Sequence, residues 1–140
     1  MAADLRECAD YGEKYGVLIG VQNHGDMLKT AEECIKIIDM VDSDWFGLIV
    51  DTGYFMTPDP YVDFAKAVPY AVNFQVKESP FGKESTVRTD LKRLVRIVYD
   101  GGYRGYLPIE TLSIPNRPYK PKELVPQFLA ELRVALDHLG

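Results

Sequence analysis

Short apolar runs alternate with amphipathic helical stretches along the chain, and this alternation constrains the fold more than any other feature. The apolar runs lie at residues 17–21, 48–50 and 106–109, and the stretch 71–76 is the third predicted strand in chain order. Helical patterns with one apolar face lie at residues 5–15, 30–41, 60–68, 91–98 and 125–139. Strands that are joined by helices run parallel through right-handed crossovers. The order therefore predicts one α/β domain over residues 1–140, with one helix followed by four parallel βα units.

Parallel βα units form either an open doubly wound sheet or a closed (β/α)₈ barrel. No glycine-rich phosphate-binding motif follows the first apolar run, so nucleotide-binding folds lose support. The chain has 140 residues, whereas a complete barrel takes about 250. We therefore expect half of a barrel, with apolar strands buried on both faces. Two copies that pair edge to edge would close the open edges in a homodimer.

Charge and cysteine content exclude several kinds of partner and setting. The 21 acidic and 16 basic residues give a net charge of −5, which argues against nucleic acid or an anionic membrane as the main partner. No apolar run approaches the ~20 residues of a membrane-spanning helix. Cys8 and Cys34 cannot build a disulfide framework, so a reducing, cytoplasmic setting is expected. Both cysteines lie on apolar helix faces, where a free cysteine is usually a buried small hydrophobe.

Polar residues lie at the end of each predicted strand, where the carboxyl ends of parallel strands meet at one edge and bind ligands. These residues are, in chain order, Gln22, Asn23 and His24; Asp51; Gln75, Lys77 and Glu78; and Glu110. A long loop at 78–88 carries Arg88 and could close over an anionic or polyhydroxylated ligand, or could simply be a mobile surface loop. The succession of four polar strand ends predicts a small-molecule site.

Each polar position also has a purely structural interpretation. Asp51 could cap its own turn, and the two glutamines could be hydrogen-bonded core amides. His24 could fix its own loop, and Lys77 with Glu78 could form a solvated ion pair. Glu110 is the hardest to explain in this way, because it ends an apolar strand deep in the fold.

Four stretches at the strand ends resemble the sugar phosphate isomerase/epimerase superfamily, the xylose isomerase-like TIM barrels. They are Gly-Val-Gln-Asn-His-Gly at 20–25, Gly-Leu-Ile-Val-Asp-Thr-Gly at 47–53, Pro-Tyr-Ala-Val-Asn-Phe-Gln-Val-Lys-Glu at 69–78 and Gly-Tyr-Arg-Gly-Tyr-Leu-Pro-Ile-Glu at 102–110. The resemblance covers nearly the whole chain but only the second half of the family's fold. It implies a (β/α)₈ TIM-barrel type of architecture, present here as a half-barrel.

The resemblance also implies a divalent metal, held in the family by Glu, Asp, His and Glu from the last four strands. The matching residues here are Gln22, Asp51, Gln75 and Glu110, so two ligands are replaced by glutamine. An amide oxygen can bind Mg²⁺ or Mn²⁺ but adds no charge, so we expect a weak metal site or none. The loss of a carboxylate at position 22 also removes a candidate base and argues against ordinary two-base epimerisation.

The resemblance implies a protein that acts on a sugar, a sugar phosphate or a related hydroxycarbonyl compound by metal-assisted proton transfer. Glu110 is the expected base or metal ligand, Lys77 the electrophile and His24 a further proton carrier. The residues expected to contact the carbohydrate ligand are Gln22, Asn23, His24, Gln75, Lys77, Glu78 and Arg88. The alternative is a non-catalytic carbohydrate-binding or regulatory half-barrel that has lost the metal site and self-associates.

Overall fold

Helices and strands alternate along the chain as the sequence predicts. The computed structural model describes residues 1–139. The elements in order are α1 (Ala2–Glu13), β1 (Ile19–Gln22), α2 (Ala31–Val41), β2 (Phe46–Asp51), α3 (Pro60–Ala67), the 3₁₀ helix η1 (Val68–Tyr70), β3 (Ala71–Lys77), α4 (Leu91–Asp100), β4 (Ile109–Glu110) and α5 (Pro121–Asp137). Within residues 1–139, no helix is long and apolar enough to cross a membrane.

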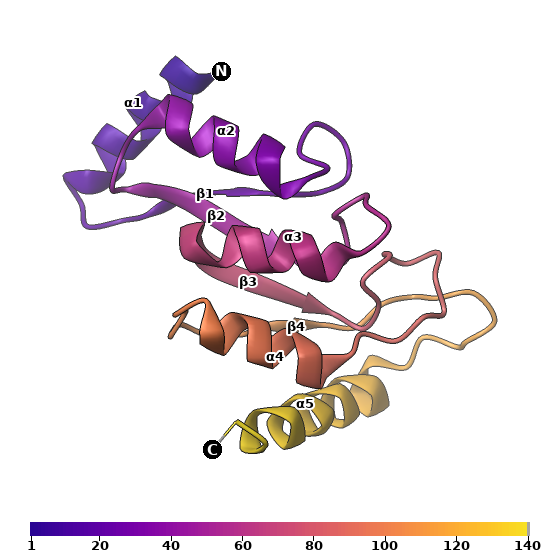
Figure 1. The fold of residues 1–140 in the computed structure, drawn as a ribbon. Helices are drawn as coiled ribbons and strands as arrows, with labels where there is room; N and C mark the ends of the chain where they lie inside the picture. The colour runs from indigo at the N-terminus through magenta and orange to yellow at the C-terminus, as the bar shows by residue number, and fades with distance from the viewer. Residues whose placement is uncertain (140) are drawn as a thin grey trace.

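The four strands form one parallel sheet in the order β1-β2-β3-β4. Figure 1 shows helices α2, α3, α4 and α5 following one another along one side of this sheet. Each strand pairs with the next strand in the sequence, which is the arrangement of successive βα units in a barrel wall. The predicted α/β class with four parallel βα units is confirmed.

Side-chain caps set the starts of three helices. Thr30 and Glu33 form the predicted capping box of α2, in which the Thr30 hydroxyl accepts from the Glu33 amide at 3.2 Å and the Glu33 carboxylate accepts from the Thr30 amide at 3.0 Å. Asp59 accepts from the Tyr61 amide at the start of α3. Asp90 does the same for α4 through the Arg93 amide. These local signals explain why the helix starts follow from sequence.

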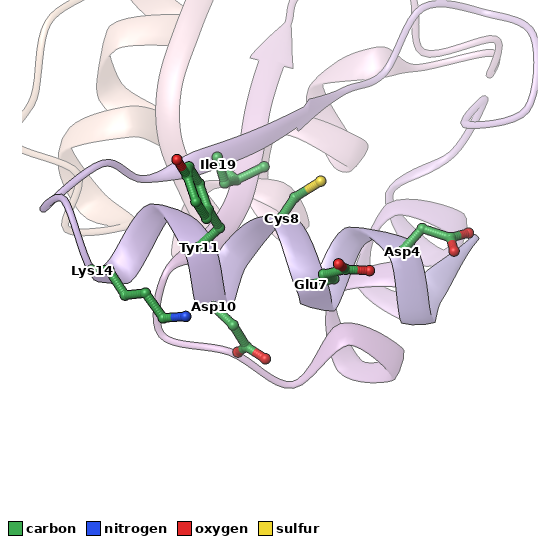
Figure 2. A pocket seen from close by; sticks show the side chains of 7 residues that line it. All are labelled: Asp4, Glu7, Cys8, Asp10, Tyr11, Lys14 and Ile19. Atoms are coloured by element: carbon green, nitrogen blue, oxygen red, sulfur yellow. The ribbon is translucent and has the colours of Figure 1, made fainter.

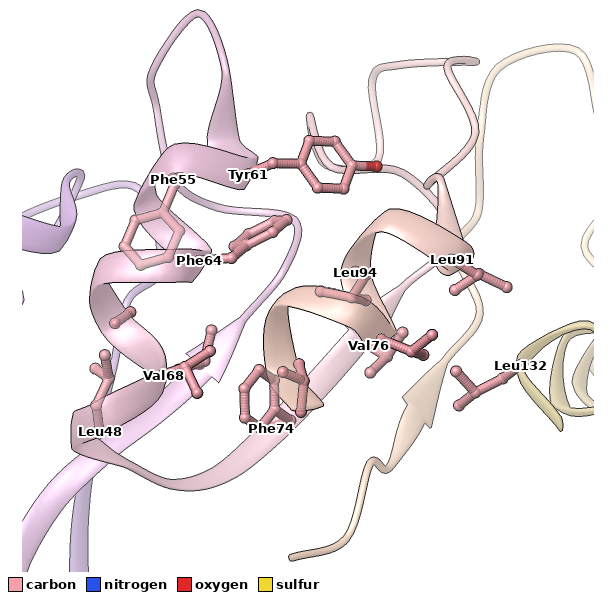
Figure 3. Packing of buried hydrophobic residues seen from close by; sticks show 14 of the residues in the cluster. Leu48, Phe55, Tyr61, Phe64, Val68, Phe74, Val76, Leu91, Leu94 and Leu132 are labelled. Atoms are coloured by element: carbon pink, nitrogen blue, oxygen red, sulfur yellow. The ribbon is translucent and has the colours of Figure 1, made fainter. Parts of the chain in front are cut away.

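The main core lies between the sheet and the helices. Leu48, Phe74 and Val76 point from the strands toward Phe64 of α3 and Leu94 of α4, as Figure 3 shows. A second, smaller core beneath α1 consists of Ala9, Val41 and Phe46. Phe46 of the second core and Leu48 of the main core are two positions apart on β2. Since side chains alternate between the two faces of a strand, both cores lie on the same face of the sheet. The other face is left for polar side chains.

The first and last strands differ from their predictions. β1 begins only at Ile19, and Val17 and Leu18 are 52% and 51% exposed. The expected burial on both faces is wrong for β1, whose residues are half-buried or exposed, but holds for β2, in which every residue except Ile49 is buried. The last strand contains only Ile109 and Glu110, and Tyr106 is largely exposed instead of lying in a strand.

The two cysteines also differ from each other. Cys34 is fully buried in the main core, as predicted. Cys8 is exposed, and the prediction that it packs as a small hydrophobe is wrong. The face of α1 that packs inward carries Ala9 and Gly12, and Cys8 lies about 100° around the helix from Ala9.

Candidate functional site

Five of the predicted residues share the face of the sheet opposite the helices. Asp51 is in register with Gln75, and Lys77 is in register with Glu110. Gln22 is in register with Ile49, two residues before Asp51, and therefore points to the same face. We call Gln22, Asp51, Lys77 and Glu110 the rim cluster, because direct contacts join them at the carboxyl ends of the strands.

Asp51 is the buried anchor of the rim cluster. Its side chain is 0% exposed, and its Oδ2 accepts from Gln22 Nε2 at 2.7 Å. Its Oδ1 accepts from the Gly53 amide at 2.9 Å, so the predicted Asp-Thr-Gly turn is present as well. Burial raises the pKa of Asp51 above its usual value, and the hydrogen bonds together with the Lys77 ammonium oppose that rise.

Lys77 places a buried ammonium between two carboxylates. Its side chain is 3% exposed, and its Nζ lies 3.3 Å from Asp51 Oδ2 and also pairs with Glu110 Oε2. Gly53 makes room for its stem, since a Cβ at that position would lie 2.8 Å from Lys77 Cγ. The interpretation of Lys77 as the solvated partner of Glu78 is wrong, because the two side chains have separate partners.

Glu110 supplies the accessible carboxylate of the cluster. Its side chain is 48% exposed while its Oε2 pairs with the buried ammonium. A carboxylate that is open to solvent on one side can exchange a proton with a bound molecule. The cluster therefore places an accessible proton acceptor next to a buried hydrogen-bond donor.

Asn23 lies beside the cluster but is engaged with the backbone. It is fully buried, its Nδ2 donates to the Asp51 carbonyl at 2.8 Å and its Oδ1 accepts from the Asp51 amide at 2.8 Å. Both polar atoms of the amide therefore hold the end of β1 against the end of β2. Gln75, in register with Asp51, is half-buried on the open face.

An aromatic residue that the sequence did not reveal completes this edge. His24 stacks on the ring of Tyr54 with a centroid distance of 4.1 Å and an interplanar angle of 29°. Lys77 Nζ lies 5.6 Å from the centroid of the same ring. The sequence feature that could have pointed to Tyr54 is its position three residues after Asp51, in the loop that follows a strand end.

Glu78 and Arg88 have other partners. Glu78 is 3% exposed and accepts from Arg117 at 2.9 and 2.8 Å, from Arg88 at 3.0 Å and from the Leu112 amide at 2.6 Å. Arg88 also pairs with Glu131 of α5. Burial opposes ionisation of Glu78, but these donors hold its pKa below the usual value. The structure thus joins Glu78 to the loop after β4 and Arg88 to Glu78 and α5, and neither residue to the rim cluster.

The donor set of the rim does not fit the divalent metal that the family resemblance implies. The Lys77 ammonium bridges the two available carboxylates, Asp51 and Glu110, and the other two positions are neutral amides. Across residues 1–139, no group of three or more His, Cys, Asp or Glu side chains is placed to hold a metal ion. A divalent ion bound to these carboxylates would lie directly against the ammonium and be repelled by it.

Two hollows of the described structure lie away from the rim cluster. One of about 700 Å³ is formed between α1 and the start of β1, and Figure 2 shows Cys8 and Tyr11 on the side of α1 nearest to Ile19. Another of about 370 Å³ lies on the helix-free face and includes Leu18, Gly20 and Val72. The helix-free face is therefore hollowed further down the strands, while Asp51 and Lys77 at the rim are buried.

Comparison with known proteins agrees with this architecture. A family model described as a xylose isomerase-like TIM barrel matches residues 1–132. No curated protein matches the sequence at a significant level.

Several solved structures share the fold. The 3-keto-D-glucoside 4-epimerase from E. coli is 16% identical with a TM-score of 0.78, and the match covers 95% of this chain and 52% of that one. An L-ribulose 3-epimerase is 18% identical with a TM-score of 0.78, covering 99% and 55%. The D-psicose 3-epimerase from Clostridium cellulolyticum H10, solved with D-tagatose, is 17% identical with a TM-score of 0.69, covering 98% and 53%.

The chain thus spans about half the length of these solved structures. With the family model matching nearly the whole sequence and the parallel βα units in place, the chain belongs to the xylose isomerase-like TIM barrel family.

Proposed function

We propose that the rim cluster is half of a carbohydrate site that moves a proton at a carbon next to a carbonyl group. The observation that carries this proposal is the Asp51–Lys77–Glu110 arrangement, which sets an accessible carboxylate beside a buried ammonium at the ends of adjacent strands. The epimerases of 3-keto-D-glucoside, L-ribulose and D-psicose with a similar fold support a sugar or related hydroxycarbonyl compound as the substrate class.

Each residue has a distinct part in the proposed reaction. Glu110 accepts the proton from the carbon next to the carbonyl, and the electron pair of the broken C–H bond moves onto the carbonyl oxygen. The Lys77 ammonium donates a hydrogen bond to that oxygen as its negative charge develops. Asp51 holds the ammonium in place through their ion pair. Glu110 then returns the proton to the same carbon. Return to the former carbonyl carbon also requires the hydroxyl proton of the first carbon to pass to the enolate oxygen, so that the carbonyl group moves to the first carbon.

The remaining residues of the edge are suited to hold the sugar. Gln22 and Gln75 present amide groups that can orient hydroxyls. The Tyr54 ring, with His24 stacked on it, offers an apolar face beside the polar cluster. His24 is also the candidate for a second proton carrier, which epimerisation by two bases would require. The match covers about half of each similar solved structure, so strands outside the matched region would supply the rest of the pocket.

Exchange of substrate hydrogen with solvent tests the proposal. The protein is incubated in D₂O with D-fructose or D-tagatose, and proton NMR follows deuterium incorporation at the carbons next to the carbonyl. We expect the wild type to catalyse exchange and Glu110→Gln to lose it. Glu123→Gln is the matched control, because Glu123 is an exposed carboxylate on α5 that pairs only with Lys120 among the described residues. Full exchange by Glu110→Gln would refute Glu110 as the base.

A non-catalytic carbohydrate-binding half-barrel is the second candidate. The two glutamines at positions 22 and 75 favour it, because they remove two titratable groups from the rim. Saturable binding of these sugars by calorimetry, with no deuterium exchange, would support this candidate and refute the enzymatic proposal.

A further inference from the structure

We propose that the Lys77 ammonium is the resident cation of the rim cluster and stands in place of a divalent metal. The use of this cation in catalysis rests on the proposed function. The charge arrangement itself depends only on the contacts among Lys77, Asp51 and Glu110.

A count of charges supports a monovalent, covalently attached cation. Asp51 and Glu110 carry two negative charges, and Lys77 reduces the sum to one negative charge. The two carboxylates without the ammonium would match a divalent ion. With the ammonium present, a divalent ion would leave the cluster with excess positive charge in a largely buried place, which is costly. The ammonium and a metal therefore exclude each other.

Gln22 fits the lysine-based cluster better than a carboxylate would. Its Nε2 donates a hydrogen bond to Asp51 Oδ2 at 2.7 Å, the same oxygen that faces Lys77 Nζ. A carboxylate at this position would have no proton to donate and would add a second negative charge next to Asp51. The amide thus stabilises the ionised Asp51 without further charge.

The surrounding backbone fixes the position of Lys77. Its amide donates to Thr52 Oγ1 at 2.8 Å, and its carbonyl accepts from Thr89 Oγ1 at 2.7 Å. Gly53 leaves space for the lysine stem, as described above. An ammonium group has three N–H donors, and two are directed to Asp51 and Glu110.

Titration with Mn²⁺ in the absence of substrate tests the inference. Calorimetry and thermal unfolding are used on the full chain. The wild type is expected to show no stoichiometric Mn²⁺ binding at micromolar concentrations and no change in Tm with Mn²⁺ or with a chelator. Lys77→Met keeps the length of the stem but leaves two carboxylates without a cation. This variant is expected to bind Mn²⁺ at least about tenfold more tightly than the wild type, and Mn²⁺ should raise its Tm.

Two controls separate this effect from non-specific binding. Lys77→Met combined with Glu110→Gln should lose the gained affinity. Lys122→Met removes an exposed lysine of α5 and should behave as the wild type.

Two results would overturn the inference. They are tight one-to-one binding of Mn²⁺ by the wild type, and a folded Lys77→Met variant with no gain in affinity. If Lys77→Met folds only in the presence of Mn²⁺, this rescue would itself support the inference. If Lys77→Met does not fold at any Mn²⁺ concentration, the same titration is carried out with Lys77→Gln. All these measurements omit sugar, so a failed deuterium-exchange experiment leaves them unaffected.

Discussion

Replacement of Glu78 by glutamine would test how strongly one buried carboxylate holds the segment after β4. Glu78 accepts two hydrogen bonds from Arg117, one from Arg88 and one from the Leu112 amide. Through Arg117 and Leu112 it joins the end of β3 to the loop that follows Glu110. Loss of its charge should therefore loosen that loop and lower the free energy of unfolding.

The expected size of the effect follows from burial. Breaking a fully buried ion pair costs about 3–5 kcal/mol, because the remaining partner is left uncompensated. Here the side chains of Arg117 and Arg88 are 24% and 46% exposed, so both can regain contact with water. Glutamine also keeps one oxygen that can accept from the Leu112 amide. We therefore expect Glu78→Gln to lower the free energy of unfolding by about 2 kcal/mol.

Urea unfolding, monitored by circular dichroism, measures the difference in the free energy of unfolding between the wild type and Glu78→Gln. The pH dependence of this difference provides a second test. The pKa of Glu78 is lowered in the folded state, so its ionised form stabilises the fold above the usual glutamate pKa of about 4.3. This contribution is lost as the pH falls through the lowered folded pKa. The difference between wild type and Glu78→Gln should be full near neutral pH and should shrink in strong acid.

Glu131→Gln is the matched control for this experiment. Glu131 pairs with Arg88 as Glu78 does, but its side chain is 36% exposed, so the loss should stay below about 1 kcal/mol. Equal losses for the two variants, or a Glu78→Gln effect that persists unchanged in acid, would refute the argument that burial and ionisation of Glu78 hold the loop.

Three further predictions follow from the same structure. Gly53→Ala should lower the free energy of unfolding by about 1–3 kcal/mol in urea titrations, because its Cβ would lie 2.8 Å from Lys77 Cγ; an unchanged value would mean that the stem moves aside freely. A thiol reagent should modify exposed Cys8 quickly and Cys34 only on unfolding, since burial raises the pKa of the Cys34 thiol to about 12. Equal rates of modification of the two cysteines in the native state would contradict the burial of Cys34. Sedimentation of the 140-residue chain should give the mass of two copies, because the outer edges of β1 and β4 are unpaired within the described residues and Leu18 is exposed on the open face. A well-folded monomer would exclude the homodimer.

Much of the architecture could be predicted from local patterns. Apolar runs and amphipathic stretches repeat at the spacing of βα units, and the capping box at Thr30 marks a helix start by itself. Parallel strands place their carboxyl ends at one edge, so the sequence predicts that Asp51, Lys77 and Glu110 lie close together. These features depend on neighbouring residues or on the period of a strand.

The partners of each charge were decided by tertiary structure. Lys77 pairs with residues 26 and 33 positions away in the sequence, Asp51 and Glu110, and not with adjacent Glu78. Strand register and the alternation of side chains between faces determine this choice. The buried ammonium between Asp51 and Glu110 is the basis for the proposal that it excludes a second cation. The sequence alone therefore determined where the candidate site lies, because strand ends can be predicted from local pattern. Only the folded chain decided which residue lies between its two carboxylates.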